Sequence, residues 1–426
     1  MGWNGSIVKQ KHVSGAVHQQ IYLESAQSGY RRAPMSRRLR IGIIYGYYKD
    51  WIAGTYYLQN LLCALNTLSD PELPHIVVLT PKRKQFLDLK RETGYPFLSF
   101  FRFGNRALWM RALNKLSSLL LHKRLHERQR IPRVDALFPN PDRKYSSRVN
   151  KRIYWIPDFQ DMHLPWFFHR DELLVRRQQT ISIITSRDHL ILSSRDAEKD
   201  LYRFYGEPKC ITSVVPFAVT HPNYSAVNIE DVRKDFGIPE KYFLVSNQFW
   251  AHKNHLVVLR AIKHLQGEGI HIFVVFTGSP ADYRNPDYYA LVQDYVAKQA
   301  ISSSVCFIGL IERRRQLRLM HEAIAVVQPS LFEGWSTVIE DAMAMNQLIV
   351  ASRLDVHIEQ LKGYPFSTYF GPSSHEDLAK TIALLLETTA ARASFDYSSR
   401  VWRFAQGFLS VARKSSSSAS DLDRPT

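Results

Sequence analysis

The chain has 426 residues, of which 45% are hydrophobic and 12% aromatic, and this composition excludes a disordered or fibrous protein. Its length favours two domains over one. Lys and Arg number 56 against 39 Asp and Glu, so the net charge is +17, which favours anionic partners: phosphorylated small molecules, anionic lipids or nucleic acid.

Cysteine usage and hydropathy bear on the compartment. Cys63, Cys210 and Cys306 lie far apart and lack the spacing of a metal site or a disulfide framework, as is typical of a reducing cytoplasm. No apolar run approaches the ~20 residues of a membrane-spanning helix, and the N-terminus lacks the apolar core of a signal peptide. We expect a cytoplasmic protein, either soluble or peripheral on the inner face of the membrane.

The first half of the chain alternates strand and helix patterns. Residues 1–36 lack periodicity and predict a basic disordered tail, with Met35 as an alternative start of the chain. Apolar runs over 39–45, 75–80, 134–139 and 151–156 predict strands, and a helix is expected from Thr55 to Leu65. The alternation indicates a Rossmann-like domain over residues 37–222.

The segment 106–130 is the most basic part of the body of the chain. Its apolar residues recur at helical spacing around Trp109, and Arg111 and Lys115 fall on the opposite face. Two readings stay open: an amphipathic helix with a solvated basic face, or a helix that docks on an anionic membrane. Nucleic acid is disfavoured because no recognised binding motif accompanies the charge.

The second half repeats the alternation. Strands are predicted over 242–246, 271–278, 305–309, 323–327 and 348–351, which indicates a second Rossmann-like domain over residues 223–394. A helix over 395–413 is expected to complete the first domain, and the Ser-rich tail 414–426 to be disordered. Arg313, Arg314 and Arg315 are expected to be a solvated helix start.

One stretch organises the second half. The strand ending near 327 is followed by Glu333-Gly334-Trp335, at the edge where open α/β sheets bind ligands. Thr337 and Glu340 fit a capping box at the start of the next helix. The first-turn amides of that helix, with its dipole, form a site suited to phosphate.

The residues around this turn resemble a known family. Phe-Glu-Gly-Trp-Ser-Thr, with Glu333 and Asp341 eight positions apart, is similar to the motif of GT-B glycosyltransferases of family 4, the glycosyl transferases group 1. The resemblance implies that Glu333 contacts the hydroxyls of the donor sugar and Asp341 the nucleotide ribose. The second acid of the family is usually Glu, so Asp341 is a departure.

Two further stretches resemble the family. Its members often carry Arg and Lys, aimed at the donor phosphates, where this chain has Asn247 and Lys253, so only the Lys is kept. Asp161 stands where the family has a His, and the nearby His163 is either its replacement or a structural residue. Gly278, at the end of a predicted strand, is expected to let the donor approach the backbone.

The prediction is therefore an α/β protein of the GT-B fold, with two Rossmann-like domains facing a cleft. We expect a retaining, metal-independent hexosyltransferase, with mannosyl transfer as one candidate, that moves sugar from a nucleotide-sugar donor to a glycan or lipid-linked acceptor in cell-surface polysaccharide assembly. No cofactor is expected. The alternatives are a catalytically silent GT-B scaffold on an anionic surface and a GT-B nucleotide-sugar epimerase.

The candidate site residues fall into three groups. The catalytic candidates are Glu333, Lys253 and His163. The candidates for donor binding are Asn247, Lys253, Gly278, Glu333, Gly334, Trp335, Ser336, Thr337 and Asp341. The candidates for the acceptor or cleft loops are Gly54, Thr55, Asp161 and His163. Lys253 and the amides of 335–337 are expected to stabilise the leaving phosphate.

Overall fold

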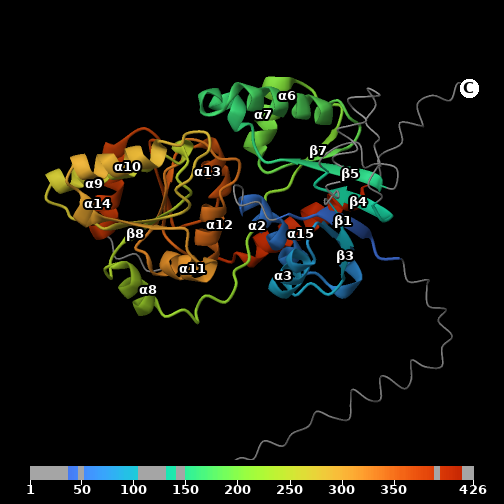
Figure 1. Cartoon of the computed structure of the whole chain (residues 1–426), viewed down its shortest axis with the longest axis horizontal. Helices are drawn as coiled ribbons and strands as arrows, with labels where there is room; N and C mark the ends of the chain where they lie inside the picture. Colours follow the sequence, from blue (N-terminus) through green and yellow to red (C-terminus); the bar gives the residue numbers. More distant parts are fainter. Residues whose placement is uncertain (1–36, 47–51, 104–130, 141–148, 388–393, 415–426) are drawn as a thin grey trace, which may run out of the picture. The chain divides into compact units, whose positions relative to one another are not determined.

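The computed structural model describes residues 37–46, 52–103, 131–140, 149–387 and 394–414. The predicted tail 1–36, the basic segment 106–130 and residues 415–426 of the predicted C-terminal tail lie outside these residues. In the described part, strands and helices alternate along the chain (Figure 1), and every strand pairing is parallel. Parallel strands need crossover connections, which the helices provide.

The first sheet has seven strands within the described residues, in the order β3-β2-β1-β4-β5-β6-β7. Its strands are β1 (Arg40–Ile44), β2 (His75–Thr80), β3 (Leu98–Arg102), β4 (Val134–Phe138), β5 (Val149–Ile156), β6 (His189–Leu192) and β7 (Ile211–Val214). The helices along this part are α2 (Ile52–Leu65), α3 (Arg83–Thr93), α5 (Gln160–His163), α6 (Arg170–Ile184) and α7 (Arg195–Tyr205).

Alternate residues of these strands face opposite layers, as the period of a strand requires. Ile41 and Ile43 belong to a buried cluster with α2 and α3. Leu190 and Leu192 belong to another cluster, with Ala197 and Leu201 of α7. Helices therefore cover both faces of the sheet, which explains the nearly continuous apolar runs of its strands.

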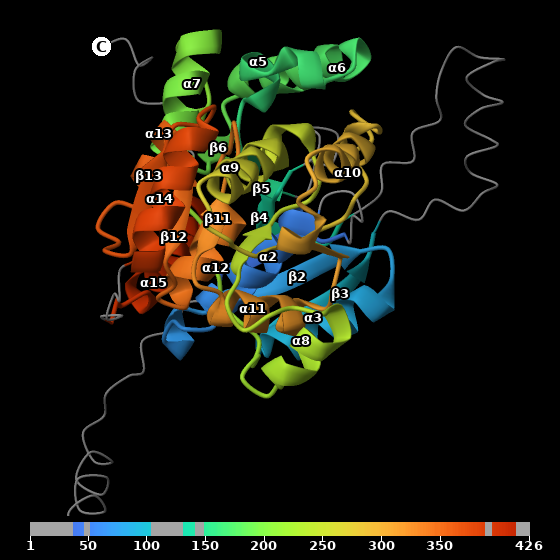
Figure 2. The ribbon, with the colours of Figure 1, turned by 90° about the vertical axis from the view of Figure 1, so that its left-hand side faces the viewer.

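The second sheet has six strands in the described residues, in the order β10-β9-β8-β11-β12-β13. Its strands are β8 (Phe243–Ser246), β9 (Val274–Thr277), β10 (Val305–Gly309), β11 (Val326–Gln328), β12 (Ile349–Ser352) and β13 (Ser367–Phe370); Figure 2 shows β11, β12 and β13. Its helices are α8 (Ile229–Phe236), α9 (His255–Gly267), α10 (Tyr288–Lys298), α11 (Arg313–Glu322), α12 (Thr337–Ala344), α13 (Asp355–Gln360) and α14 (His375–Glu387).

This sheet is also covered on both faces. Phe243 and Val245 pack in a cluster with α9, α10 and α14, whereas Leu244 packs with α8, α11 and α12. In both sheets the first strand of the half lies between its second and fourth strands, the order of a doubly wound Rossmann-like sheet. The strands up to β3 are added on one side of β1 and those from β4 onward on its other side, and the same change of side occurs between β10 and β11 about β8. Ligands bind at such switch points.

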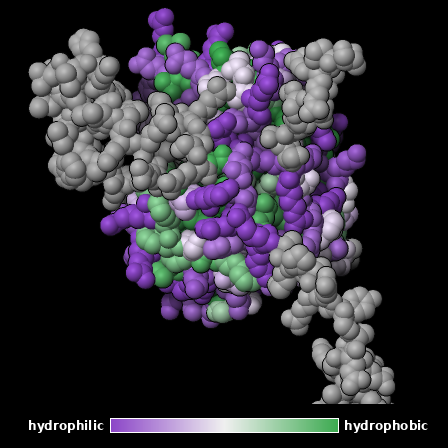
Figure 3. All heavy atoms as spheres, turned by 90° about the vertical axis from the view of Figure 1, so that its right-hand side faces the viewer, coloured by the Kyte–Doolittle hydropathy of each residue, from purple (hydrophilic) through white to green (hydrophobic). Residues whose placement is uncertain are grey.

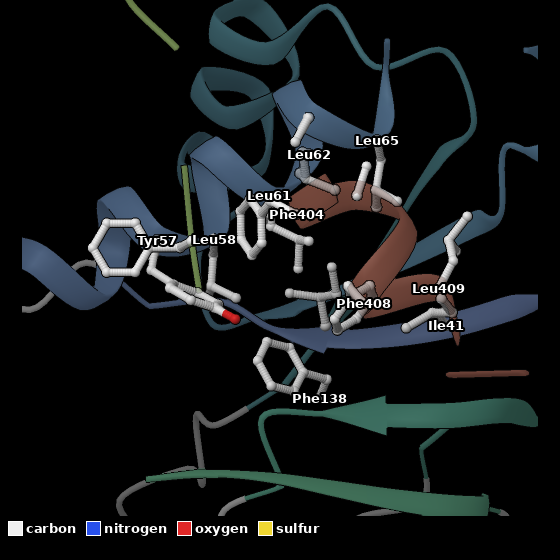
Figure 4. Close-up of a cluster of buried hydrophobic side chains, with 14 of the residues drawn as sticks. Ile41, Tyr57, Leu58, Leu61, Leu62, Leu65, Phe138, Phe404, Phe408 and Leu409 are labelled. Carbon is white, nitrogen blue, oxygen red and sulfur yellow. The ribbon is translucent and has the colours of Figure 1, made fainter. Parts of the chain in front are cut away.

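The last described helix, α15 (Ser398–Arg413), packs on the first sheet although it follows the second in sequence. Its Phe404 and Phe408 lie among Tyr57 and Leu61 of α2 and Phe138 of β4 (Figure 4). Tyr57 meets Phe404 edge to face with ring centroids 5.4 Å apart. Large aromatic side chains of this kind dominate the burial energy of a core.

The elements agree with the sequence-based expectations, with shifted boundaries. The strand predicted over 271–278 begins at Val274, and the strand predicted over 323–327 is β11, which ends at Gln328. The helix that ends at Tyr205 is capped by Ser194, whose Oγ accepts from the amide of Ala197 over 3.0 Å. Boundary shifts of this size reflect fraying of strand and helix ends.

The helices and the surface of the described part of the chain bear on contact with a membrane. None of its helices is both long enough and apolar enough to cross a bilayer. Hydrophilic side chains predominate on the face drawn in Figure 3, with smaller groups of apolar side chains between them.

Candidate active site

The candidate site lies at the carboxyl ends of β8 and β11, the two strands at the switch point of the second sheet. Asn247 directly follows β8, and Gln328 is the last residue of β11. The loop 329–336 then leads from β11 into α12 and carries Glu333. Topology therefore brings together two loops that are about 80 residues apart in the sequence.

Glu333 and Lys253 form an ion pair at this edge. Lys253 ends a short 3-10 helix, Ala251–Lys253, and its Nζ donates to Oε1 of Glu333 over 2.6 Å. Ser330 Oγ and Gln328 Nε2 also donate to the same oxygen, each over 2.7 Å. The side chains of Lys253 and Glu333 are 19% and 9% exposed, so the pair is largely withdrawn from water.

The charge state of Glu333 follows from these contacts. Burial alone would raise its pKa, but the Lys253 ammonium, supported by the Ser330 hydroxyl, outweighs it and holds the pKa below the usual value for Glu. Glu333 is therefore a carboxylate at neutral pH. A charged carboxylate beside an ammonium can orient sugar hydroxyls, while the ammonium offers charge to a phosphate.

Asn247 and Gly278 lie close to each other, and Asn247 contacts Gln328, which in turn contacts Glu333. Asn247 is buried, and its Nδ2 donates to Oε1 of Gln328 over 3.1 Å. Gly278 has φ +150°, and a Cβ at this position would lie 2.1 Å from the carbonyl oxygen of Asn247. The glycine is thus required for the close approach of two backbone segments, whatever else binds there.

Asp341 is 1% exposed and contacts an Arg and a His side chain. Its Oδ1 accepts from Arg313 of α11 over 2.5 Å and from Nε2 of His221 over 3.0 Å. Burial would raise its pKa, but Arg313 and His221 hold it below the usual value for Asp. The expectation that Arg313 is only a solvated helix start is therefore wrong.

The predicted capping box is also wrong. The N-cap of α12 is Ser336, whose extended backbone lets its Oγ accept from the amide of Ile339, and Thr337 is the first helical residue. Glu340 does not reach back to the cap. It is fully buried and bonds Gln360 and Tyr397 instead, while Arg400 pairs with it over 3.3 Å.

The amides expected to form a phosphate site are partly engaged. The amide of Ser336 donates to Oε1 of Gln360 over 3.1 Å. Trp335 is buried in the cluster of the first sheet, and its Nε1 donates to the carbonyl of Phe217 over 3.0 Å. Trp335 therefore joins the second-sheet loop to the chain that leaves the first sheet.

Gly334 meets the loop that follows β5. A Cβ on Gly334 would lie 2.5 Å from the carbonyl oxygen of Pro157 and 2.7 Å from Cβ of Asp158. Burial raises the pKa of Asp158, and the neighbouring Glu333 adds to the rise. No side chain larger than hydrogen fits at Gly334 while this contact is made.

The expected acceptor residues lie nearby or in α2. Nε2 of His163 is 2.7 Å from Oδ2 of Asp200, and its ring lies 5.1 Å from that of Phe332. Asp161 is buried, and burial raises its pKa. Thr55 is in the first turns of α2 with Gly54, and its hydroxyl donates to the carbonyl of Gly46 over 3.1 Å.

Sequence reasoning missed several residues that the structure brings to the site. Gln328 and Ser330 hold Glu333, and Arg313 and His221 hold Asp341. A polar residue at the carboxyl end of a short buried strand was a usable signal for Gln328. No sequence pattern indicated His221 or Arg313 as site residues, because Asp341, which both contact, lies 120 and 28 residues away from them.

Within the residues described, no group of three or more His, Cys, Asp or Glu side chains is arranged to hold a metal ion.

Two doubly wound parallel sheets, with charged residues at the switch point of the second, define a two-domain α/β protein of the GT-B class. Residues 228–402 match the family model of the glycosyl transferases group 1, which covers fewer than half of the residues of the chain. No curated protein matches the sequence.

Solved structures agree with the class. The chain is similar to a glycosyltransferase from Rickettsia africae ESF-5, at 12% identity over 88% of this chain and 96% of that chain, with a TM-score of 0.57. Anabaena HepE in complex with UDP and glucose matches at 14% identity over 88% and 97%, with a TM-score of 0.59. Sucrose-phosphate synthase from Thermosynechococcus elongatus matches at 15% identity over 88% and 96%, with a TM-score of 0.55.

At these identities the structural likeness shows the fold, and it confirms the prediction of an α/β GT-B protein. The family match adds that residues 228–402 are similar to the glycosyl transferases group 1.

Proposed function

We propose that the protein is a retaining glycosyltransferase of family 4 that transfers a hexosyl group from a nucleotide-sugar donor. The observation that carries the proposal is the Lys253–Glu333 ion pair at the switch point, inside the segment that matches the glycosyl transferases group 1. The reported complexes of Anabaena HepE with UDP and with UDP-glucose support a donor of this class.

The chemical problem of the reaction is charge. The bond between the anomeric carbon and the departing diphosphate breaks, the sugar becomes oxocarbenium-like, and negative charge grows on the phosphate. In the proposed mechanism the Lys253 ammonium stabilises the phosphate and the Glu333 carboxylate orients the sugar hydroxyls. The acceptor oxygen attacks from the same face, and its proton passes to the departing phosphate oxygen.

No metal is part of the proposal, because the ammonium of Lys253 supplies a positive charge where the leaving group departs. Asp341 is proposed to hold the ribose, and this requires a donor to share or replace its contacts with Arg313 and His221. His163, paired with Asp200, is proposed to contact the acceptor or the sugar.

The acceptor is proposed to be a glycan or a lipid-linked glycan of cell-surface polysaccharide assembly, and the sugar a hexose, with mannose as one candidate. The net charge of +17 supports a cytoplasmic enzyme held on the inner face of a membrane by the basic segment 106–130. That segment lies outside the described residues.

The proposal is tested first by binding and then by turnover. A thermal-shift screen against UDP, GDP, ADP and their sugars should give a higher Tm with one base, since a ligand that binds only the folded state stabilises it. The selected nucleotide sugar should then be hydrolysed slowly without acceptor, and Glu333→Gln should reduce this rate by orders of magnitude.

Other outcomes identify the alternatives. Binding of a nucleotide sugar without hydrolysis, and without transfer to added glycan acceptors, would indicate a silent GT-B scaffold. Interconversion of the bound sugar with its epimer would indicate an epimerase. A rate that is unchanged in Glu333→Gln would remove Glu333 from the reaction.

A further inference from the structure

The carboxylate of Glu333, the candidate catalytic residue, is hydrogen-bonded to a set of connected, buried polar side chains. Asn247 Nδ2 donates to Oε1 of Gln328 over 3.1 Å, and Gln328 Nε2 donates to Oε1 of Glu333 over 2.7 Å. The same Nε2 donates to Ser330 Oγ over 3.0 Å, and that hydroxyl donates to Glu333 over 2.7 Å. Asn247 is 5% exposed, and Gln328 and Ser330 are fully buried.

The direction of the Gln328 amide depends on Asn247. A side-chain amide has a donor end and an acceptor end, and in Gln328 the acceptor end meets the Nδ2 of Asn247. The donor end is therefore the one that faces Ser330 and Glu333. If the amide rotated by half a turn, its oxygen would meet the carboxylate of Glu333, and the amide of Asn247 would lose its acceptor.

The donors also act on one oxygen of the carboxylate. Lys253, Gln328 and Ser330 all reach Oε1 of Glu333, and no residue in the described ranges donates to Oε2. Three donors on one oxygen prevent rotation of the carboxylate and leave Oε2 as the oxygen for a ligand.

The backbone of the loop that carries Ser330 is also fixed by hydrogen bonds. Ser352 Oγ donates to the carbonyl of Ser330 over 2.6 Å, and Asn254 Nδ2 donates to the carbonyl of Pro329 over 3.2 Å. The loop between β11 and Glu333 is thus anchored on both sides, so a change in the direction of Gln328 would be felt by Glu333.

We propose that Asn247 and Gln328 are positioning residues for Glu333, and that Asn247 acts through Gln328 and not on the phosphates of the donor. The inference rests on the proposed function, since it names what holds the carboxylate of the same site. It assigns Asn247 a task different from that of the Arg which related enzymes carry at this place.

The experiment is a double-mutant cycle with Asn247→Leu, Gln328→Met and both together. Each single change leaves the other amide buried without its partner, whereas the double change removes both polar ends. The Tm of the double variant should therefore exceed the value that the two single losses predict by addition. An additive Tm loss would overturn the pairing on which the proposal rests.

Turnover separates positioning from stability. For hydrolysis of UDP-glucose, GDP-mannose and ADP-glucose without acceptor, each single variant should lose up to about 100-fold in kcat on the substrate that wild type uses, with little change in KM. The double variant should stay slow although its loss of Tm is smaller than the sum of the two single losses. Recovery of kcat together with Tm would reduce the pair to a structural role and overturn the proposal.

A direct contact of Asn247 with the donor phosphate would give a different result. If Asn247 contacted the donor phosphate, Asn247→Leu alone would weaken binding of the free nucleoside diphosphate, and Gln328→Met would leave that affinity unchanged. This pattern would overturn the proposal. The matched control is Gln347→Met, because Gln347 is also fully buried but bonds the carbonyls of Met320 and Ala323 away from Glu333. It should lower Tm and leave kcat unchanged.

A readout independent of activity distinguishes this proposal from the proposed function. A carbon-13 titration of the Glu333 carboxyl, assigned with Glu333→Gln, should show a higher midpoint in Gln328→Met, because a donor to the carboxylate has been lost. An unchanged midpoint would overturn the positioning role. Wild-type protein that hydrolyses none of the three nucleotide sugars would overturn the proposed function, and the positioning role would then stand or fall on this midpoint.

Discussion

At the scale of single residues, the site depends on charges that are buried together. Lys253 and Glu333 lose most of their hydration, and each makes that loss tolerable for the other. Removal of one partner therefore does more than delete a contact, because the remaining charge stays in a largely dry place. This asymmetry makes the pair the first target for mutation.

Lys253→Ala should lower kcat/KM for donor hydrolysis by about 2–4 kcal/mol of transition-state stabilisation, because a lone ammonium near the leaving phosphate has no substitute. It should also weaken binding of the nucleoside diphosphate and raise the pKa of Glu333, whose burial is then uncompensated. Initial rates measure the first effect, calorimetric titration with the nucleoside diphosphate the second, and a carbon-13 titration of the Glu333 carboxyl the third.

The control for this change is Lys298→Ala. Lys298 lies on α10, is 69% exposed and pairs with Asp294 one turn away. Its removal should leave rate and affinity unchanged. Equal activity in Lys253→Ala and Lys298→Ala would place the phosphate site elsewhere.

Asp196 provides a prediction about pH. Burial, followed by the nearby carboxylates of Asp200 and Asp355, raises the pKa of Asp196 to about 6, and Lys199 only partly offsets this. The folded state thus favours the protonated form. The stability that Asp196 contributes is present below about pH 4 and is lost as the pH rises through about 6.

Asp196→Asn should therefore raise Tm at pH 8 and have little effect at pH 4. The gain should be about 1 kcal/mol, less than the full linkage value because the side chain is partly exposed to solvent. Thermal unfolding of both proteins across this range measures it. Glu207→Gln, which changes an exposed acid beyond the end of α7, is the control, and a gain that is independent of pH would contradict the assignment.

At the scale of elements, the N-cap of α12 lies at Ser336, one residue before the predicted Thr337, and this shift also changes the role of Glu340. Ser336 and Thr337 are both good cap residues, but only Ser336 has the extended backbone of an N-cap. Once the cap is at Ser336, the third helical residue is Ile339, and Glu340 turns into the interior. There it joins α12 to Tyr397 and to Arg400 of α15.

Ser336→Ala should lower stability by about 0.5–2 kcal/mol, and Thr337→Ala should cost less, because only the first removes the acceptor for the amide of Ile339. Glu340→Ala should cost more than either, about 3–5 kcal/mol, because it leaves the Arg400 guanidinium without its carboxylate. Denaturant unfolding of the three variants gives the order, and the reverse order for Ser336 and Thr337 would restore the capping box.

At the scale of the whole molecule, charge is the property least explained by the fold. The first 40 residues hold seven Lys and Arg and one Glu, a net of +6, so most of the +17 belongs to the rest of the chain. A positive excess of this size attracts anionic surfaces over a Debye length of about 8 Å at physiological ionic strength.

Changing Arg111, Lys115, Lys123 and Arg124 to Gln should reduce sedimentation with anionic liposomes steeply at low salt, since each basic residue near such a surface contributes about 1 kcal/mol. Nucleotide binding should be unaffected. Deletion of residues 1–36 is the comparison, because the tail is also basic. Loss of binding in the deletion and not in the four-site variant would assign the membrane contact to the tail.

Much of the fold could be predicted from the sequence because its signals are local. The strands of both sheets are short apolar runs, and the helices between them have amphipathic patterns, so alternation was enough to predict two Rossmann-like halves. Glu333 was predicted from its place after a strand together with the family resemblance of its motif, and Lys253 was predicted from that resemblance. The positions of domain boundaries and the roles of the site residues remain predictions.

Only the tertiary structure decided which side chains of the candidate site contact one another. Lys253 meets Glu333 across 80 residues, Asn247 meets Gln328 across 81, and His221 meets Asp341 across 120. Sequence pattern reports which face of an element is apolar, whereas these contacts depend on which strands become neighbours at the switch point. Strand order is set by the packing of whole helices on whole sheets, and so the residues that orient Glu333 appear only when the chain is folded.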